Sequence, residues 1–372
     1  MPIAEVRVYR VPLAARSSYT MSNSTVAVPE STVVEVACTD GTVGHGEACM
    51  ASPQFQPAHN DGIRAALRIL APSILGLDPR RISQVHAAMD AVMEGNREAR
   101  AVLDIACWDL AGKLLDQPVV DLLGGRLMDD VTTYHVIGIG TPDEAASAAE
   151  RLQSEGHTRL QLKAGGRPVH EDVACIRAVA DALRPGTDLA VDTNRGWSTA
   201  EAIAVSEACA GIPMSMEQPC ATEQELRAIK PHLRHPLVVD ENATDLPTIA
   251  RMVSTGLADG FGLKVSRLGG LAPMRAVRDL CMAARVPMSA DDAWGGDVVG
   301  SACVALGATL IAQFSRGAWL AHPYHQVHYD QANGPRIAGG FVTLPDAGPG
   351  LGLDIGEGDF GEPEAVYRPR TT

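Results

Sequence analysis

Five short apolar runs in the middle of the chain each end in a charged residue that could do chemistry, at intervals of about 25 residues. These residues are Lys163, Asp192, Glu217, Asp240 and Lys264. Charged residues at the carboxyl ends of evenly spaced strands are how a β/α barrel presents a catalytic set at one mouth. Carboxylates can hold a hard cation, and two lysines can act as an acid/base pair. The pattern therefore indicates metal-assisted chemistry on a carboxylate substrate.

Asp192, Glu217 and Asp240 end the third, fourth and fifth predicted strands. Neighbouring strands lie about 5 Å apart, so three successive strand ends can converge on one ion. A site with only oxygen ligands selects Mg²⁺, with Mn²⁺ as the alternative, over zinc. Any one of these residues alone could instead be a helix N-cap. Because three lie in register, we predict that they bind one Mg²⁺ per subunit.

Lys163 and Lys264 end the second and sixth predicted strands, which lie opposite one another in a closed eight-stranded barrel. Their ammonium groups should then face each other across the mouth. A lysine works as a base at neutral pH only if burial or a nearby cation lowers its pKa from about 10.4. The predicted metal and the apolar strand ends supply both influences, so we predict that these two lysines are catalytic.

The elements that position these residues follow from an alternation of apolar runs and amphipathic segments after Thr132. The apolar runs predict eight strands, at 133–137, 160–162, 189–191, 214–216, 237–239, 262–263, 287–289 and 310–312. The amphipathic segments predict helices, for example at 143–154, 171–182, 200–208 and 272–284. This alternation is typical of a parallel barrel, so the predicted fold class is α/β, a modified TIM (β/α) barrel.

The flanking segments predict a second domain. Strand patterns occur at 3–11, 32–38 and 43–47, and helical periodicity runs over 59–115. Strands followed by helices are typical of an α+β domain, which here would cap the barrel. The predicted organisation is a capping domain over 1–128, a catalytic barrel over 129–335, and a Gly- and Pro-rich segment over 336–372 that returns to the capping domain.

Composition excludes several classes of function. The chain has 372 residues and a formal charge of −14, without a basic stripe that could bind nucleic acid. Its eight cysteines are scattered without a Cys-x-x-Cys pair, which favours a reduced compartment and a cytoplasmic protein. No apolar stretch approaches the roughly 18 residues of a membrane span. We therefore expect a small-molecule carboxylate substrate, no membrane or nucleic-acid partner, and a homo-oligomer.

Longer motifs resemble those of the enolase superfamily. Residues 101–113 and 118–125 resemble its capping-domain signature. Three further segments resemble its metal-ligand motifs, at 191–194, 217–219 and 240–241. The resemblance covers essentially the whole chain and implies that Mg²⁺ stabilises an enediolate. The lysine on the sixth strand resembles the muconate-lactonising group, because the mandelate racemase group carries a histidine after the seventh strand and residues 289–294 contain none.

One position departs from that group, which usually carries Lys-x-Lys on the second strand. Here the first of the two is Gln161, whose amide can still donate hydrogen bonds to a substrate carboxylate. Asn194, within the first metal-ligand motif, is a second expected substrate contact. The departure means that the substrate cannot be copied from muconate-lactonising enzymes.

A narrower resemblance accommodates this departure. Residues 160–168, 291–297 and 317–321 resemble the proline-betaine and hydroxyproline-betaine 2-epimerases and the similar cis-3-hydroxy-L-proline dehydratases. The resemblance implies that Trp319 faces a cyclic ammonium and that Asp292 balances its charge. Trp offers the best cation–π face, worth about 2 kcal/mol when desolvated. Simple barrel packing is the alternative role for Trp319.

Two loops of the capping domain are expected to close over the substrate. One runs over 14–24 and contains Tyr19, and the other runs over 50–59 and contains Phe55. Phe55 stands where the betaine epimerases carry tyrosine, so one substrate hydrogen bond should be missing. Long polar loops between firm elements are typical of lids, although an ordinary mobile loop fits each alone.

His322, His325 and His328 are predicted to be surface or loop histidines, because they follow the last strand without a matching partner. The favoured function is Mg²⁺-dependent removal of the α-proton of a proline betaine or hydroxyproline betaine, giving the 2-epimer. The alternative on the same site is dehydration of cis-3-hydroxy-L-proline. An acid-sugar dehydratase and a non-catalytic betaine-binding barrel are more remote alternatives.

Overall fold

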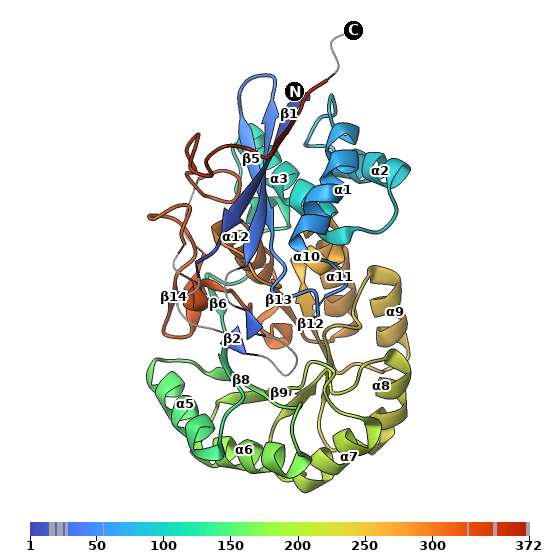
Figure 1. Cartoon of the computed structure of the whole chain (residues 1–372), viewed down its shortest axis with the longest axis vertical. Coiled ribbons are helices and arrows are strands. Elements are labelled where there is room, and N and C mark those ends of the chain that lie inside the picture. Colours follow the sequence, from blue (N-terminus) through green and yellow to red (C-terminus); the bar gives the residue numbers. More distant parts are fainter. Residues whose placement is uncertain are drawn as a thin grey trace.

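The computed structural model describes residues 1–14, 29–54, 56–325, 327–344 and 348–369, and the backbone of 19–20 and 25–26. Its amino-terminal part is an antiparallel sheet packed against helices (Figure 1). The sheet has the order β16-β1-β4-β5, with β1 at Ile3–Pro12, β4 at Glu30–Cys38, β5 at Val43–Ala48 and β16 at Ala365–Tyr367. The helices are α1 at Asn60–Ser73, α2 at Ile82–Val92, α3 at Arg97–Leu115 and α4 at Val119–Leu122.

Helix α3 lies directly on β5 because two glycines remove the side chains between them. A Cβ on Gly46 would lie 1.8 Å from the carbonyl oxygen of Val102, and one on Gly44 would lie 2.4 Å from that of Ala106. This close approach buries α3 almost completely. Helix α3 therefore packs between the antiparallel sheet and the helices that follow β12 (Gly260–Lys264).

The central part is a curled parallel sheet with helices outside it (Figure 1). Its strands follow one another in chain order: β7 (His135–Ile137), β8 (Arg159–Lys163), β9 (Asp188–Asp192), β10 (Ser215–Glu217), β11 (Leu237–Val239), β12 (Gly260–Lys264) and β13 (Met288–Asp291). The α-helices are α5 (Pro142–Ser154), α6 (Val169–Ala182), α7 (Thr199–Ala208), α8 (Glu223–Ile229), α9 (Leu246–Ser254), α10 (Val265–Leu268), α11 (Leu271–Ala284) and α12 (Asp297–Gly307). Capping boxes at Thr141, Ser198 and Thr222 start three of them.

The eighth predicted strand, 310–312, is wrong. Leu310 follows α12 in a turn, and a 3-10 helix, η2, begins at Ala312 and ends at Phe314. The sheet is instead closed by the segment 315–319, which bridges Met288 through Ser315 and Thr133 through Ala318. Gly317 interrupts regular pairing there, since its φ is +76° and a Cβ would lie 2.0 Å from the carbonyl oxygen of Thr132. Apolar character alone therefore marked the wrong segment.

The carboxyl-terminal segment contacts both parts of the molecule (Figure 1). Strands β14 (Ile337–Ala338) and β15 (Phe341–Thr343) form a small sheet with β6 (Asp130–Thr132). Strand β16 then pairs antiparallel with β1. The remaining elements are the short hairpin of β2 (Tyr19–Thr20) and β3 (Thr25–Val26) and the 3-10 helices η1 (Lys230–His232) and η3 (His322–Tyr324).

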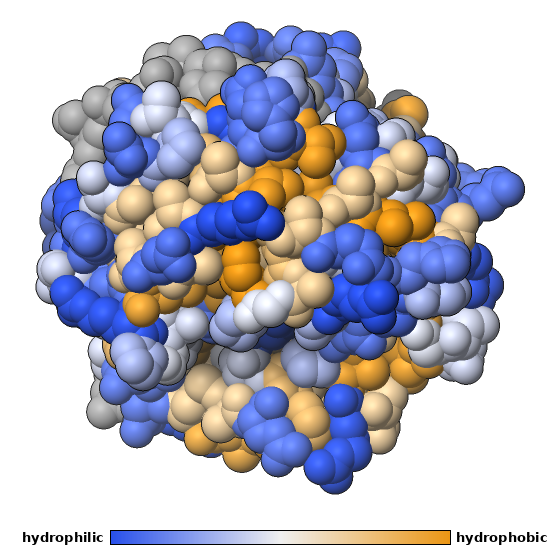
Figure 2. All heavy atoms as spheres, turned by 90° about the horizontal axis from the view of Figure 1, so that it is seen from below, coloured by the Kyte–Doolittle hydropathy of each residue, from blue (hydrophilic) through white to orange (hydrophobic). Residues whose placement is uncertain are grey.

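Seen from below, hydrophobic residues gather across the middle of the molecule's face, with hydrophilic residues around and between them (Figure 2). All eight cysteines, each within the described part, are buried free thiols. Among the described residues, no helix combines the length and the apolar character that a membrane crossing requires.

Candidate active site

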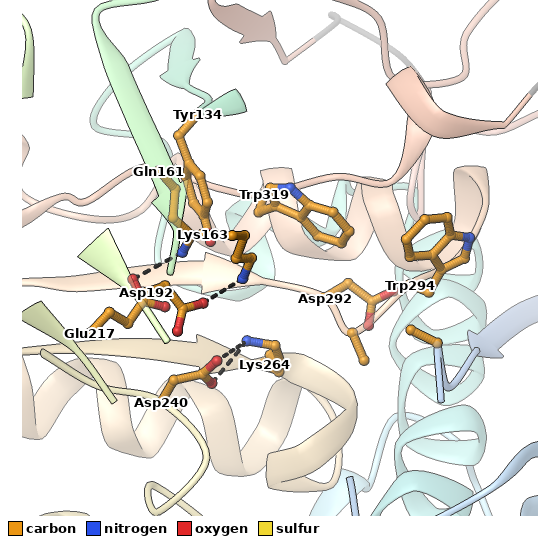
Figure 3. A pocket seen from close by; sticks show the side chains of 12 residues that line it. Tyr134, Gln161, Lys163, Asp192, Glu217, Asp240, Lys264, Asp292, Trp294 and Trp319 are labelled. Carbon is orange, nitrogen blue, oxygen red and sulfur yellow. Dashed lines mark hydrogen bonds and ion pairs between the residues drawn. The ribbon is translucent and has the colours of Figure 1, made fainter. Parts of the chain in front are cut away.

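The five charged residues of the sequence pattern meet at the carboxyl ends of β8 to β12 (Figure 3). Strand register fixes this meeting, because Lys163 pairs with Asp192 and Asp192 pairs with Glu217 across three adjacent strands. Asp240 follows β11 directly, and Lys264 is the last residue of β12. All five are buried and line one pocket. The parallel sheet thus places the predicted acid/base and metal-ligand side chains at one mouth.

Each lysine contacts one of the outer carboxylates (Figure 3). The Lys163 Nζ donates to Asp192 Oδ2 at 2.5 Å, and the Lys264 Nζ donates to both Asp240 oxygens at 2.8 and 2.7 Å. The two lysines come from β8 and β12, the outer two of the five strands whose ends carry this set. They are therefore placed to approach a bound carbon atom from two faces.

Three buried carboxylates, Asp192, Glu217 and Asp240, crowd this site. Burial, followed by repulsion from Asp192 and Asp240, raises the pKa of Glu217 to about 7. Burial also opposes ionisation of Asp240, but Arg267 and Lys264 outweigh it and hold its pKa at about 2. This all-oxygen donor set is suited to a hard divalent cation, which would neutralise the crowded charge.

Gly262, in the middle of β12, leaves the space that the carboxylates need. A Cβ at this position would lie 3.2 Å from Glu217 Oε1 and 3.6 Å from the Asp240 Cβ. The Gln161 Nε2 donates to Glu217 Oε2 at 3.0 Å, and its side chain lines the pocket. The amide that replaces the expected lysine therefore sits against the central carboxylate.

Asn194 supports Asp192 and is not among the residues that line the pocket. Its side-chain amide donates to Asp192 Oδ2 at 3.0 Å and to Glu241 Oε1 at 3.3 Å, while its backbone N–H donates to Asp192 Oδ1 at 2.8 Å. Asn194 has a φ of +46°, an uncommon backbone conformation for a residue other than glycine. The strained turn thus aims the Asp192 carboxylate.

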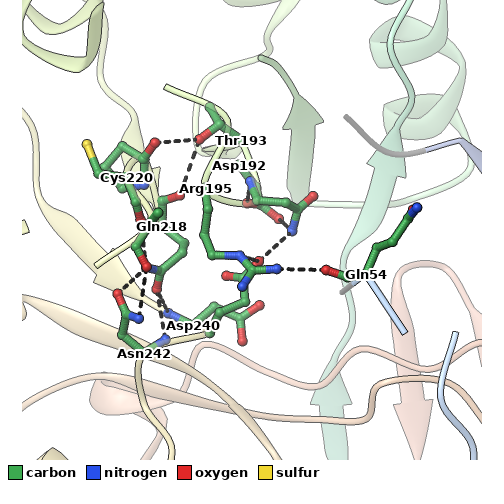
Figure 4. Close-up of polar contacts among 12 residues, drawn as sticks. Gln54, Asp192, Thr193, Arg195, Gln218, Cys220, Asp240 and Asn242 are labelled. Carbon is green, nitrogen blue, oxygen red and sulfur yellow. Dashed lines mark hydrogen bonds and ion pairs between the residues drawn. The ribbon is translucent and has the colours of Figure 1, made fainter. Parts of the chain in front are cut away.

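Several supporting residues were not predicted from the sequence (Figure 4). Gln218, with a φ of +37°, accepts the backbone N–H groups of Asp240 and Asn242 at 3.0 and 3.2 Å. Arg195 donates to the carbonyl oxygen of Gln54 at 2.9 Å and so connects the 50–59 loop to the barrel. Arg267 donates to the Asp240 carboxylate at 2.5 Å. Its position three residues after Lys264, at the start of a helix, was the signal that could have revealed it.

The remaining wall of the pocket is aromatic (Figure 3). Trp319 stacks on Tyr324 with ring centroids 5.9 Å apart and lies 5.8 Å from the ring of Trp294. The Trp319 backbone N–H donates to Asp291 Oδ1 at 2.8 Å, which ties this wall to β13. Tyr134 completes the wall of the pocket.

Asp292 is a buried carboxylate in this wall. Ser266 donates to its Oδ1 at 3.2 Å, while its Oδ2 has no hydrogen-bond donor among the described residues. Burial raises the pKa of Asp292 well above its ordinary value. Without a neighbouring cation, this buried group therefore favours its neutral form.

The two predicted loop contacts lie outside the described side chains. The backbone of Tyr19 belongs to β2, but its side chain is not described, and Phe55 is likewise outside the described residues. Ala51, from the same loop as Phe55, does line the pocket. The roles predicted for Tyr19 and Phe55 remain predictions.

Of the predicted surface or loop histidines, His322 and His325 are buried, so the prediction of a surface position is wrong for these two, although both lie in the irregular segment after the last strand of the parallel sheet. His322 and His328 share a partner, Asp297 at the start of α12, whose Oδ1 lies 2.8 Å from His322 Nε2 and 3.0 Å from His328 Nδ1. Sequence distance concealed this pairing, since at least 25 residues separate Asp297 from each of the two histidines.

Comparison with known families gives two matches that together span most of the chain. Residues 3–124 match the amino-terminal domain of the mandelate racemase / muconate lactonizing enzyme family. Residues 143–358 match the enolase C-terminal domain-like family.

Individual relatives are similar over almost their whole length. A cis-3-hydroxy-L-proline dehydratase of Roseibium aggregatum is 37% identical over 99% of this chain and 100% of its own. An N-succinyl-L-Arg/Lys racemase of Bacillus cereus is 28% identical over 96% of both chains. The crystal structure of an enolase superfamily member from Roseovarius nubinhibens, complexed with magnesium, superposes with a TM-score of 0.94 at 29% identity and covers 99% of both chains.

Proposed function

Because this chain belongs to the mandelate racemase / muconate lactonizing enzyme family of the enolase superfamily, we propose that it removes the α-proton of a cyclic amino-acid-like carboxylate. The observation that carries the proposal is the pair of buried lysines, from the two outer strands β8 and β12, that line one pocket with three carboxylates. A binding protein would not need two such bases. The proposal extends to Mg²⁺, the substrate and the product.

Asp192, Glu217 and Asp240 would hold Mg²⁺, and the magnesium complex of the Roseovarius relative supports this choice of ion. When bound, Mg²⁺ supplies positive charge beside the substrate carboxylate, where negative charge develops as the α-proton leaves. In the structure the ammonium groups of Lys163 and Lys264 are hydrogen-bonded to two of these carboxylates. Freed from them, a buried lysine loses its proton more readily and can act as a base.

The chain's own residues account for the remaining steps. One lysine takes the α-proton, and Gln161 is placed to donate a hydrogen bond to the substrate carboxylate. Trp319 and Asp292 hold the ring ammonium against the aromatic wall. Each lysine acting as acid or base contributes about 10²–10⁴-fold to the rate.

Dehydration of cis-3-hydroxy-L-proline is the product-forming step that the comparisons support best. The C2–H proton passes to one lysine, the C3–O bond breaks, and the other lysine protonates the leaving hydroxide to give water and a C2=C3 double bond. The support is the 37% identity with the Roseibium dehydratase over essentially the whole length of both chains. This order reverses the sequence-based preference, which placed epimerisation first.

Epimerisation at C2 of proline betaine or hydroxyproline betaine is the second candidate. It needs the same first step, followed by return of a proton to the opposite face by the second lysine. The positions of Lys163 and Lys264 on the two outer strands and the racemase among the relatives favour it. An aromatic face attracts a quaternary ammonium without N–H donors, which also fits a betaine.

Proton NMR in D₂O with Mg²⁺ tests these proposals. The enzyme is incubated separately with cis-3-hydroxy-L-proline, L-proline betaine and 4-hydroxyproline betaine. Loss of the C3–OH group of the first, giving the unsaturated ring as the C2=C3 enamine or its imine tautomer, identifies the dehydratase, and α-deuteration with inversion of either betaine identifies the epimerase. Lys163→Ala and Lys264→Ala should lose turnover, whereas Lys230→Ala, at a lysine outside the pocket, should keep it. Absence of α-proton exchange with all three compounds would refute the proposed substrate class.

A further inference from the structure

A second group of metal-ligand side chains lies outside the pocket, where α12 begins. Asp297 is the first residue of α12, His322 belongs to η3, and His328 lies in the loop after it. One ligand atom from each lies within 4.8 Å of the other two. Asp297 and His322 are buried, and His328 is partly buried. None of these residues has a role in the proposed reaction.

The Asp297 carboxylate is held in one orientation by the loop that carries His328. Its Oδ2 accepts the backbone N–H groups of Tyr329 at 2.6 Å and Asp330 at 3.0 Å. Its Oδ1 therefore faces the two imidazoles, at 2.8 Å from His322 Nε2 and 3.0 Å from His328 Nδ1. Three potential ligand atoms thus converge from two separate segments.

A hydrogen-bond acceptor and a hydrogen-bond donor both face the Nδ1 of His328. Its Nδ1 lies 3.0 Å from Asp297 Oδ1 and also 2.7 Å from the Nη1 of Arg336, which donates to the carbonyl oxygens of Gly334 and Pro335 as well. If Nδ1 carries a proton, it can donate to Asp297 Oδ1, but it then offers no acceptor to the guanidinium N–H of Arg336. If Nδ1 carries a lone pair, the lone pair faces a carboxylate oxygen. A cation between Nδ1 and Oδ1 would satisfy both ligand atoms, and Arg336 would keep its carbonyl acceptors.

His322 is fixed as tightly as Asp297. A Cβ on Gly300 would lie 2.8 Å from the His322 Cε1, so the ring rests directly on the backbone of α12. Its Nδ1 is buried without a hydrogen-bond partner among the described residues, which leaves Nε2 as the atom that faces Asp297. The neighbouring His325 is not part of the set, because its Nε2 lies 2.8 Å from the carbonyl oxygen of Gly295 and its Nδ1 accepts from Val327.

We propose that Asp297, His322 and His328 form a second metal site for a divalent transition ion such as Zn²⁺. Two imidazole nitrogens and one carboxylate oxygen are a ligand set that zinc accepts, with a fourth position left for water. Magnesium prefers oxygen ligands alone, so the two sites differ in ion. The ion would join η3 and its loop to the start of α12, next to the segments that carry Asp292 and Trp319 (Figure 1).

Cobalt binding in the presence of excess Mg²⁺ tests this proposal, because Mg²⁺ then fills the all-oxygen site. The full-length protein is freed of metal with a chelator, dialysed and titrated with Co²⁺, and the visible d–d absorption and bound cobalt are measured. The expected result is one Co²⁺ per chain with the spectrum of nitrogen-ligated cobalt. The principal variant is His328→Gln, at the least buried ligand, and the second is His322→Gln; each should weaken binding at least 10-fold.

Two controls separate this site from other cobalt ligands. His170→Gln removes an exposed histidine on α6 and should bind Co²⁺ like the wild type. Asp192→Asn removes a ligand of the all-oxygen site and should also leave this binding unchanged. Circular dichroism checks that each variant folds. If His322→Gln does not fold, the wild-type stoichiometry and the His328→Gln variant decide the proposal. The proposal would be overturned if the wild type bound no Co²⁺ in excess Mg²⁺. It would also be overturned if both histidine variants bound Co²⁺ as tightly as the wild type, or if Asp192→Asn lost Co²⁺ binding.

Discussion

Replacing Asp292 by asparagine should weaken substrate binding while leaving the empty protein as stable as before, or more stable. The buried carboxylate receives one side-chain hydrogen bond, from Ser266, and its Oδ2 has no donor among the described residues. Burial raises its pKa well above the ordinary value. Because the folded protein holds this proton more tightly than the unfolded chain does, the protein loses stability as the pH rises above the unfolded pKa of about 3.9. Asparagine has the same shape and does not ionise, so that loss disappears.

In contrast to its effect on stability, Asp292→Asn should weaken substrate binding. Removing one partner of a buried charge pair costs about 2–5 kcal/mol. The lower figure corresponds to a KM for an ammonium-bearing substrate that is roughly 30-fold higher, since 1.4 kcal/mol is a factor of about ten. Proton removal itself uses the lysines, so kcat should change less than KM.

Steady-state kinetics and thermal unfolding of the metal-free, substrate-free protein measure the two effects. The matched control is Asp181→Asn, which removes an exposed carboxylate on α6 and should change neither quantity. A KM within three-fold of wild type would show that Asp292 does not face the substrate cation. A lower melting temperature in Asp292→Asn would show that the carboxylate stabilises the fold, which would contradict the prediction that it destabilises the empty protein.

Three further changes have defined outcomes. Gly262→Ala should lower Mg²⁺ affinity by about 10-fold or more while the fold persists, because the new methyl group lies 3.2 Å from Glu217 Oε1; calorimetric titration with Mg²⁺ measures it, and unchanged affinity would contradict the site. Arg267→Met should raise the pKa of Asp240, which Arg267 now lowers, and should move the acid limb of the kcat/KM profile upward; an unmoved limb would exclude this role. Burial lowers the pKa of His235, so unfolded chains bind its proton first and stability should fall as the pH drops below about 6.5. His235→Gln should reduce that pH dependence in denaturant titrations at pH 7.5 and 5.5, and an identical dependence would reject the assignment.

The catalytic centre could be predicted because strand register leaves it little freedom. Lys163, Asp192 and Glu217 end strands that pair residue with residue, so an apolar run followed by a charge already specifies where that charge lies. Neighbouring parallel strands then bring the charges together whatever the helices between them do. The prediction needed only the positions of the strand ends.

The irregular parts could not be predicted in the same way. The run at 310–312 has the apolar character of a strand but follows α12 in a turn, whereas the closing segment opens with Ser315, Arg316 and Gly317 and becomes apolar only at Ala318. Asp297 reads as an ordinary first residue of a helix until the fold brings two distant histidines to it. These contacts depend on tertiary packing over many residues, which local patterns do not encode.

The pocket therefore consists of two halves with different freedom to change. Regular strands β8 to β12 hold the lysines and carboxylates, and a change there would disturb the register of the sheet. The aromatic wall instead lies on the irregular segment at 315–319 and on the turn after β13, which are joined by the hydrogen bond from the Asp292 N–H to the Trp319 carbonyl oxygen. Under the proposed function, substitutions in these two segments would alter which ring and which charge are recognised without moving Lys163 and Lys264. It follows that relatives with the same lysines and carboxylates can act on different substrates, and that residues 291–297 and 317–321 are where their specificities should diverge.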